Sequence, residues 1–309
     1  MAIQENTSFF LIQGQFIRDE SQYAVQCNCM KGRGKKLLFN SKAIRPSEYY
    51  GTMPLVAVLP SDTDLINGAA AERRKWIDML IAQYDRAYLQ HLIQYEKIIA
   101  QRNALIKYFS ENNTFDNEQL SLWNEQLIPH GIALLLRRKA FLAEFQPLFE
   151  RYFRAIVSDK ESPEITYQAT VAENTHEAWQ LLFEKSLDKD RILQRTNIGV
   201  HRDDVLFSIN GISAKHFGSQ GQQKTFVIAL KLAEYDLLEA HTGVSPLLLL
   251  DDIFDKLDES RVAGIAALLH QRTSGQVFIT DTSHERLARV FAPENTQREV
   301  LFWEVGSLA

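Results

Sequence analysis

The chain has 309 residues, 45% of them hydrophobic and 24% charged, so it holds enough apolar material for a core and is not fully disordered. Its 34 basic and 39 acidic residues give a net charge of −5, which excludes a global basic field and confines any nucleic-acid contact to a local patch. Neither a run of 18 apolar residues nor a secretory signal pattern occurs, so we expect a cytoplasmic protein without a membrane span.

The first 68 residues are predicted to be rich in β-structure. Short apolar or alternating runs, separated by turn residues, are typical of strands. The predicted strands are Phe9–Phe16, Tyr23–Cys29, Leu37–Phe39 and Leu55–Leu59. We therefore assign residues 1–68 to the first part of an α/β head.

A helical period begins near residue 69. Apolar residues recur every three or four positions over residues 69–109 and again over residues 120–156. A short turn separates the two patterns, and Pro129 and Pro147 predict kinks or breaks in the second one. Two long helices with a short joint predict an antiparallel helical arm over residues 69–158.

The remainder, residues 159–309, returns to an α/β pattern. The dipeptide Asn210-Gly211 is the strongest short signal for a β-hairpin and lies between two of the predicted strands. Because α/β portions flank the arm on both sides, we expect the arm to be inserted into one folded head. The predicted elements follow the periods of strands and helices: strands at 165–171, 204–209, 212–217, 247–250, 277–280 and 300–305, and helices at 176–195, 219–240, 259–272 and 284–290.

A pair of acids follows the most apolar of these strands. Leu247–Leu250 has the pattern of a buried parallel strand, and Asp251 and Asp252 come directly after it. Ligands of open α/β sheets bind at the carboxyl ends of the strands, where one carboxylate can hold Mg²⁺ and a second can deprotonate a water. The alternative is a strand end capped by solvated acids.

A glycine-containing helix start precedes this strand by about 30 residues. Gly218–Thr225 reads Gly-Ser-Gln-Gly-Gln-Gln-Lys-Thr and leads into an apolar helix. The free N–H groups of such a helix start can meet an anion. The alternative is a flexible loop with an ordinary helix cap at Ser219 or Thr225.

The order of these features is that of the second half of ABC-type ATPases: signature helix, Walker B strand, D-loop and switch strand. Among them the chain most resembles the RecF family, which comprises bacterial recombination-repair ATPases related to the SMC proteins. The resemblance covers nearly all 309 residues and rests on five ordered segments: Ser219–Gln223, Asp251-Asp252, His201–Asp204, Pro60–Gly68 with Glu72–Asp78, and Tyr95 with Gln101–Asn103.

This resemblance implies an ABC-type, P-loop NTPase-like α/β ATPase head with an inserted antiparallel helical arm. Residues 1–68 would be the β-rich remainder of lobe I, and residues 69–158 the arm, or lobe II. Residues 159–309 would be the C-terminal part of the head, which carries the signature motif, the Walker B strand and the D-loop.

The resemblance also implies roles at a composite ATP site. Asp251 would hold Mg²⁺ through water, and Asp252 would be the general base for attack on the γ-phosphate; a structural or metal-shell acid is the alternative role for Asp252. Asp258 would lie at the seam of a dimer and couple its two sites, whereas the switch position falls on Thr280–Thr282. The contacts to the γ-phosphate held by the opposite protomer would come from Ser219, Gly221 and Gln222.

One motif of the family does not occur in the sequence. No Gly-x-x-x-x-Gly-Lys-Ser/Thr is present, and Gly32–Lys36 has the wrong spacing. In the family this loop follows the first strand and cradles the β-phosphate. By the resemblance both the first strand and the phosphate loop are missing here, so we expect an unpaired edge or exposed apolar surface in the sheet. ATP and Mg²⁺ would be cofactors only together with such a loop.

Basic clusters on the predicted arm are candidates for DNA contacts. Such runs are usually solvated helix faces, but within a DNA-binding family they become candidate phosphate contacts. The role of His201 and Arg202 stays open between a ligand contact and a structural group. The candidate DNA-binding residues are Arg73, Arg74, Lys75, Arg137, Arg138 and Lys139.

By this resemblance the chain acts in DNA replication, repair and recombination. It would form an ATP-dependent homodimer on DNA at gaps or single-strand–duplex junctions, aid recombinase loading and the SOS response, and have RecR and RecO as partners. The family's ATPase activity is weak and DNA-dependent. Two alternatives stay open: a nucleotide-free DNA- or partner-binding fragment without ATPase activity, and another SMC-like ATPase.

Overall fold

The computed structural model describes residues 7–18, 20–32, 34–157, 161–272, 275–292 and 299–304. The chain forms two compact units, Met1–Met53 and Pro54–Ala309, so the division falls before the fifth strand and not at residue 68. Within the described ranges no helix is both long enough and apolar enough to cross a membrane.

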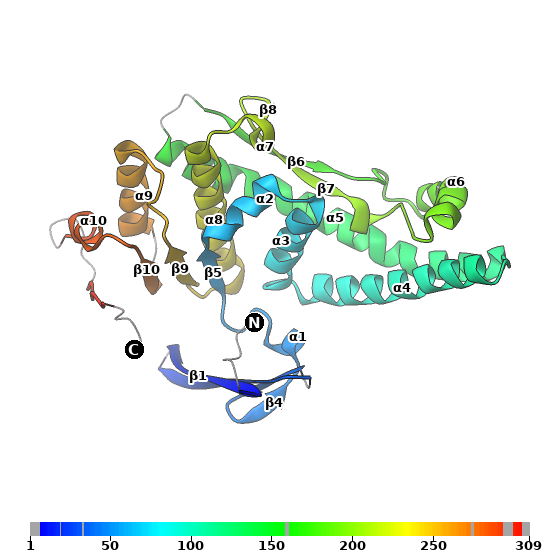
Figure 1. Ribbon diagram of the computed structural model, residues 1–309, viewed down its shortest axis with the longest axis horizontal. Helices are drawn as coiled ribbons and strands as arrows, with labels where there is room; N and C mark the ends of the chain where they lie inside the picture. The colour runs from blue at the N-terminus through cyan, green and yellow to red at the C-terminus, as the bar shows by residue number, and fades with distance from the viewer. Residues whose placement is uncertain are drawn as a thin grey trace. The chain divides into compact units, whose positions relative to one another are not determined.

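The first unit is a four-stranded antiparallel sheet in the order β1-β2-β3-β4 (Figure 1). Packed aromatic rings support it, with 5.6 Å between the ring centroids of Tyr23 and Phe39 and 6.1 Å between those of Phe39 and Tyr49. The predicted β-rich start is confirmed. Its elements are β1 (Phe9–Arg18), β2 (Ser21–Met30), β3 (Gly34–Phe39), β4 (Lys42–Ile44) and the short helix α1 (Pro46–Tyr49).

The second unit contains a parallel sheet in the order β10-β9-β5. The central strand β9 (Leu247–Asp251) pairs with β5 (Leu55–Val58) on one side and with β10 (Val277–Thr280) on the other. Alternate side chains of β9 are buried, because helix α8 (Gln220–Thr242) and neighbouring helices cover the sheet. The acid pair thus lies at the carboxyl end of the middle strand.

The outer side of β10 is an open sheet edge. No strand pairs with it in the ranges that the structure describes, and the Phe278 side chain is 50% exposed. The sequence predicts an unpaired edge or exposed apolar surface in this sheet, without indicating which strand carries it. The predicted strand at 300–305 is wrong for residues 300–304, which form no strand; they have no described neighbour to accept their backbone hydrogen bonds. Val305 lies outside the described residues.

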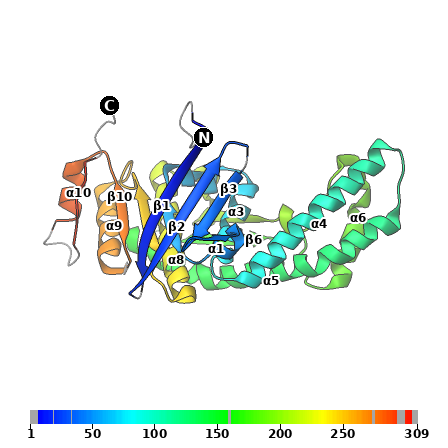
Figure 2. The same cartoon turned by 90° about the horizontal axis from the view of Figure 1, so that it is seen from below.

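The helical arm begins after η1 (Pro60–Thr63) and α2 (Asp64–Asn67). Helices α4 (Arg86–Glu111) and α5 (Asn117–Ile156) run side by side over most of the length of α4 (Figure 2). Their short connection makes them antiparallel, as the sequence predicts.

The prediction of a single helix over residues 69–109 is wrong. The chain forms α3 (Ala70–Ala82), leaves the helix at Gln83–Asp85 and starts α4 again. Asp85 causes this new start, because its carboxylate accepts a hydrogen bond of 2.9 Å from the backbone N–H of Tyr88 and caps α4. Helix α5, in contrast, continues through both of its prolines.

A second antiparallel sheet, β6-β7-β8, lies beside the arm. Its hairpin is confirmed: Asn210 and Gly211 have φ angles of 54° and 75°, which suit a two-residue turn. The predicted strand at 212–217 is wrong after Ser213, because the chain turns there into a short helix. The elements of this region are β6 (Pro163–Gln168), α6 (His176–Leu193), η2 (Val200–Arg202), β7 (Asp204–Ile209), β8 (Ile212–Ser213) and α7 (Ala214–Phe217).

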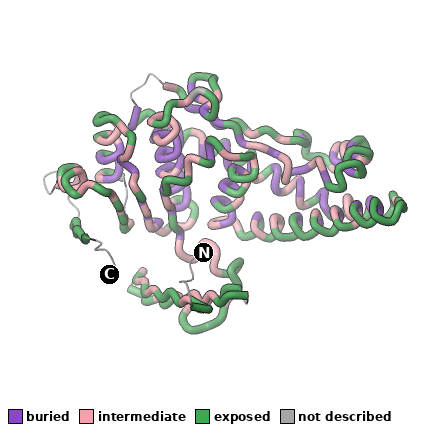
Figure 3. Tube along the Cα trace, viewed as in Figure 1, coloured by how far each residue is buried: buried purple, intermediate pink, exposed green. Residues whose placement is uncertain are grey.

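One hydrophobic core joins the arm base to the parallel sheet, and Figure 3 shows the buried residues along the facing sides of these elements. Trp76 of α3 lies at its centre, with its ring against Phe141 and Phe145 of α5 and Phe207 of β7. The Trp76 indole N–H donates a hydrogen bond of 2.6 Å to Glu234 of α8. The predicted helices at 259–272 (α9, Glu259–Arg272) and 284–290 (α10, His284–Val290) are confirmed.

Candidate functional site

The acid pair at the end of β9 has two different environments. The Asp251 carboxylate accepts a hydrogen bond from the Thr280 hydroxyl at the end of β10. Asp252 turns out of the strand with a φ of 50°, and its backbone N–H donates to the Thr280 carbonyl at 3.1 Å. This left-handed conformation is uncommon outside glycine but is tolerated by Asp. The Asp252 carboxylate has no hydrogen-bond partner in the described part of the chain and can face a ligand.

Lys224 fixes the loop that follows β9. Its ammonium donates to the Asp252 carbonyl at 2.7 Å and to the Asp255 carbonyl at 2.9 Å. Burial lowers the pKa of Lys224, and the nearby Asp252 and Asp255 charges oppose this shift. The sequence motif includes Lys224 but gives no role for it. A lysine in the first turns of a helix that precedes an acid pair is the signal that could have suggested a role.

The helix start of α8 is capped as the simpler interpretation predicts. The Ser219 hydroxyl oxygen accepts from the Gln222 N–H at 3.2 Å, and the Gln222 side-chain oxygen accepts from the Ser219 N–H at 2.9 Å. This reciprocal capping box leaves other first-turn N–H groups available.

Gly221 is not required by packing within this chain. A Cβ atom added there would meet its nearest neighbours at 3.5 Å and 3.8 Å, which are ordinary contact distances. Glycine in a helix costs about 1 kcal/mol relative to alanine. Packing within the chain therefore does not explain this glycine.

The signature helix start and the predicted D-loop lie together. Arg261 of α9 donates to the Thr225 hydroxyl at 2.9 Å and pairs with Asp258 at 3.1 Å. Gln222 donates to the Glu161 carboxylate at 3.1 Å, and Glu161 also faces Arg261 at 3.5 Å. Hydrogen bonds from the Ser260 hydroxyl and the Arg261 backbone lower the pKa of the exposed Asp258. Sequence reasoning missed Arg261 and Glu161, which join these two motifs.

The switch position has an internal ion pair. Asp281 is fully buried and pairs with Arg286 at 2.7 Å, and its carboxylate also accepts from the Ser283 N–H at 2.7 Å. The side chain that reaches the acid pair at this position is therefore that of Thr280.

These residues fit one side of a nucleotide site. The described residues hold no group of three potential metal ligands, and Mg²⁺ commonly uses one or two protein carboxylates together with phosphate oxygens and water. Asp251 and Asp252 fit that use. The sequence contains no phosphate loop to cradle a β-phosphate, so the fit is limited to the γ-phosphate side and to the cation.

Two of the predicted DNA-binding arginines are buried in internal ion pairs. Arg73 binds both carboxylate oxygens of Asp204, at 2.8 Å and 3.0 Å. Arg138 is 2% exposed and binds both oxygens of Asp78, at 2.7 Å and 2.9 Å. In this conformation neither guanidinium is accessible to a phosphate.

The other four candidates lie closer to the surface. Arg137 pairs with Asp85 at 2.8 Å and lies over the Tyr84 ring. Lys139 donates to the Ala172 carbonyl at 2.7 Å, and Arg74 donates to the Asp203 carbonyl at 2.7 Å. Lys75 is exposed. Their role in DNA binding stays a prediction.

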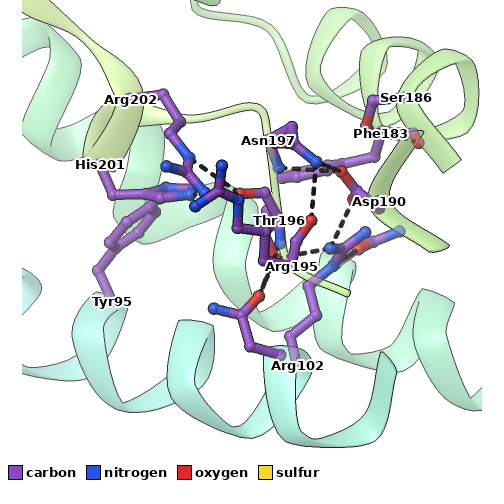
Figure 4. Close-up of polar contacts among 12 residues, drawn as sticks. Tyr95, Arg102, Phe183, Ser186, Asp190, Arg195, Thr196, Asn197, His201 and Arg202 are labelled. Atoms are coloured by element: carbon purple, nitrogen blue, oxygen red, sulfur yellow. Dashed lines mark hydrogen bonds and ion pairs between the residues drawn. The ribbon is translucent and has the colours of Figure 1, made fainter. Parts of the chain in front are cut away.

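His201 belongs to a structural network at the base of the arm (Figure 4). One ring nitrogen lies 3.1 Å from the Thr196 carbonyl, which can only accept, so this nitrogen carries the proton. The other lies 2.8 Å from the Tyr95 hydroxyl and accepts from it. Burial is the main cause that lowers the pKa of His201 to about 4, so the ring is neutral at pH 7. These contacts support the structural alternative for His201.

A buried arginine anchors the same network to the arm. Arg102 of α4 is fully buried and pairs with Asp190 at 2.8 Å. It also donates to Thr196 at 2.7 Å and to Asn124 at 2.7 Å. The Gln101–Asn103 segment of the resemblance thus holds the loop between α6 and β7 in place.

The parallel sheet with its terminal acid pair, the capped signature helix and the inserted antiparallel arm together define an ABC-type ATPase head. The comparisons with known proteins identify the particular group: the chain belongs to the family of the DNA replication and repair protein RecF. It is 45% identical to the protein of that name from Flavobacterium johnsoniae, over 92% of this chain and 79% of the relative. It is 38% identical to the one from Cytophaga hutchinsonii, over 96% of this chain and 77% of the relative. No family model matches the sequence.

Solved structures agree with this assignment. The structure of "the recombination mediator protein RecF-ATP in RecFOR pathway" superposes with a TM-score of 0.81 and 26% identity, over 92% of this chain and 77% of that one. The corresponding RecF-ATPrS structure gives a TM-score of 0.80 with the same coverage. The resemblance inferred from the sequence and the ATPase-head fold are therefore confirmed.

Proposed function

We propose that this chain acts in DNA replication and recombinational repair by binding DNA at gaps or single-strand–duplex junctions, where it aids recombinase loading and the SOS response. The observation that carries the proposal is the 45% identity to a DNA replication and repair protein over 92% of the chain. The shared fold with a recombination mediator supports it. RecR and RecO are the proposed protein partners, since the structural relative is described within a RecFOR pathway.

The head would couple DNA binding to nucleotide through self-association. Ser219, Gly221 and Gln222 form a helix N-terminus, whose free N–H groups suit a multiply charged phosphate held by another protomer. Asp251 would hold Mg²⁺, Asp252 would activate a water, and Asp258 would lie at the seam beside this helix start. Bound ATP would supply the negative charge that draws two such surfaces together.

A second candidate function is DNA or partner binding without nucleotide. The internal capping of the α8 start favours it, because Ser219 and Gln222 satisfy each other without a ligand. In this case the signature helix would be a structural element, and Ser219 would act only as its N-terminal cap.

Replacing Ser219 with arginine separates the two candidates. Under the first proposal, the chain joined to the phosphate-loop segment of a family member binds a fluorescent gapped duplex more tightly with MgATP, measured by anisotropy. S219R in that joined chain loses this increment, because its bulk and charge block the opposing surface. Binding without nucleotide should be unchanged in the variant.

Ser219→Thr is the matched control, because threonine also caps a helix start, and it should keep the ATP increment. DNA binding by the loop-carrying chain with no response to MgATP would contradict the first candidate and support the second. An ATP increment that survives in S219R would contradict the proposed role of this surface.

A further inference from the structure

Three arginines from different segments gather at Arg202, the residue next to His201. Arg74 comes from α3, Arg202 from η2, and Arg195 from the loop after α6. Burial is the main cause that lowers the pKa of Arg202, and the positive charges of Arg195 and Arg74 come next. The sequence separates these residues by up to 128 positions, so only the fold creates the cluster.

Two of the three guanidinium groups are held by neutral acceptors. Arg202 donates two hydrogen bonds to the Thr196 carbonyl, at 3.0 Å and 2.8 Å (Figure 4). Arg74 donates to the Asp203 carbonyl at 2.7 Å. These two sets of contacts orient the side chains through uncharged carbonyl groups.

The carboxylates nearest to the cluster already have other partners. Asp204 binds Arg73 through both of its oxygens. Asp190 binds Arg102 and Asn197. Asp203 accepts from the neutral groups of Tyr167 and Thr170, so it is one carboxylate whose charge acts on Arg74, against three arginines in the cluster. The chain as a whole has a net charge of −5, so a local surplus of arginine charge is not part of a general basic surface.

The loop that carries Arg195 and Arg202 is held in one conformation. Thr196 is buried and bound by Arg102 and Asn103. Gly199 has a φ of 118°, and a Cβ atom added there would lie 2.3 Å from the Tyr95 hydroxyl oxygen. A fixed set of guanidinium groups loses little side-chain freedom when it binds phosphate.

We infer that Arg74, Arg195 and Arg202 form a contact surface for the sugar-phosphate backbone of DNA, an inference that rests on the proposed function. Guanidinium groups match phosphate oxygens in geometry and charge. Binding there should be sensitive to salt and indifferent to base sequence.

Arg195→Gln tests this surface with little risk to the fold, because the Arg195 side chain is exposed. Duplex binding of the full chain is measured by anisotropy at several salt concentrations. Each phosphate contact contributes about 0.9 to the slope of log affinity against log salt, so R195Q should reduce the size of this slope by about 1. The variant should also lose the same amount of affinity for duplexes of unrelated sequence. Arg195→Lys should keep most of the slope.

Arg154→Gln is the matched control, since Arg154 is 52% exposed and its loss changes the net charge equally. A slope reduced in R195Q but unchanged in R154Q supports the surface. If the wild-type chain binds DNA, equal effects of both variants, or no effect of R195Q, would overturn the proposed surface. An acidic protein would then be the better-fitting partner for the three arginines. No DNA binding by the wild-type chain would overturn both this surface and the proposed function.

Discussion

Replacing Arg138 with methionine will lower the free energy of unfolding by about 3–5 kcal/mol, the usual cost of removing one partner of a buried ion pair. Arg138 binds Asp78 through two nitrogens, at 2.7 Å and 2.9 Å, and donates to the Val200 carbonyl at 2.9 Å. It also donates to the hydroxyls of Tyr88 and Tyr167. The single guanidinium therefore connects α3, α4, α5, β6 and η2.

Chemical denaturation, followed by tryptophan fluorescence, measures this loss. The neighbouring Arg137→Met is the matched control: its ion pair with Asp85 is about a quarter exposed, so we expect a loss of about 1 kcal/mol or less. Comparable losses in the two variants would contradict the structural role of Arg138. So would a drop in DNA affinity without any loss of stability.

Replacing Arg102 with methionine will have an effect of similar size. Arg102 is fully buried, and its removal leaves Asp190, also fully buried, without a cationic partner. A buried unpaired carboxylate costs about 3–5 kcal/mol through lost pairing and desolvation. The Phe183 ring, 5.0 Å from the guanidinium carbon, would lose a packed cation as well.

A double variant distinguishes the stranded charge from simple loss of volume. Adding Asp190→Asn to R102M removes the charge, so the double variant should be more stable than the sum of the two single losses predicts. Lys107→Met on the same helix, at a residue whose side chain is 62% exposed, should change stability by less than about 0.5 kcal/mol. Strict additivity of R102M and D190N would contradict a direct Arg102–Asp190 interaction.

Local chemistry made much of the fold predictable. The helices at 259–272 and 284–290, the strand at 277–280 and the Asn210-Gly211 hairpin depend on periodicity and turn chemistry within a few residues. The helix break at Gln83–Asp85 was missed, because the apolar period continues across it and only the Asp85 cap reveals it. The strand predicted at 300–305 is wrong for residues 300–304, because an apolar run does not show whether a pairing strand exists.

The candidate site was predictable in its motifs but not in its contacts. Glycine, acid and apolar residues in a fixed order identified the positions of Ser219, Asp251 and Asp252. The link from Arg261 to Thr225 spans 36 residues and that from Arg73 to Asp204 spans 131, so neither leaves a local trace. A run such as Arg137-Arg138-Lys139 also does not show which cation points inward.

The most direct test of the proposed binding to gapped DNA is a comparison of two DNA ligands at low salt. The wild-type chain is titrated against a labelled gapped duplex and an intact duplex of the same length and sequence, at about 50 mM salt, where backbone contacts are strong. We expect binding to both ligands and tighter binding to the gapped one. Equal affinity for the two would contradict recognition of gaps, and binding to neither would contradict a DNA-binding role for this chain.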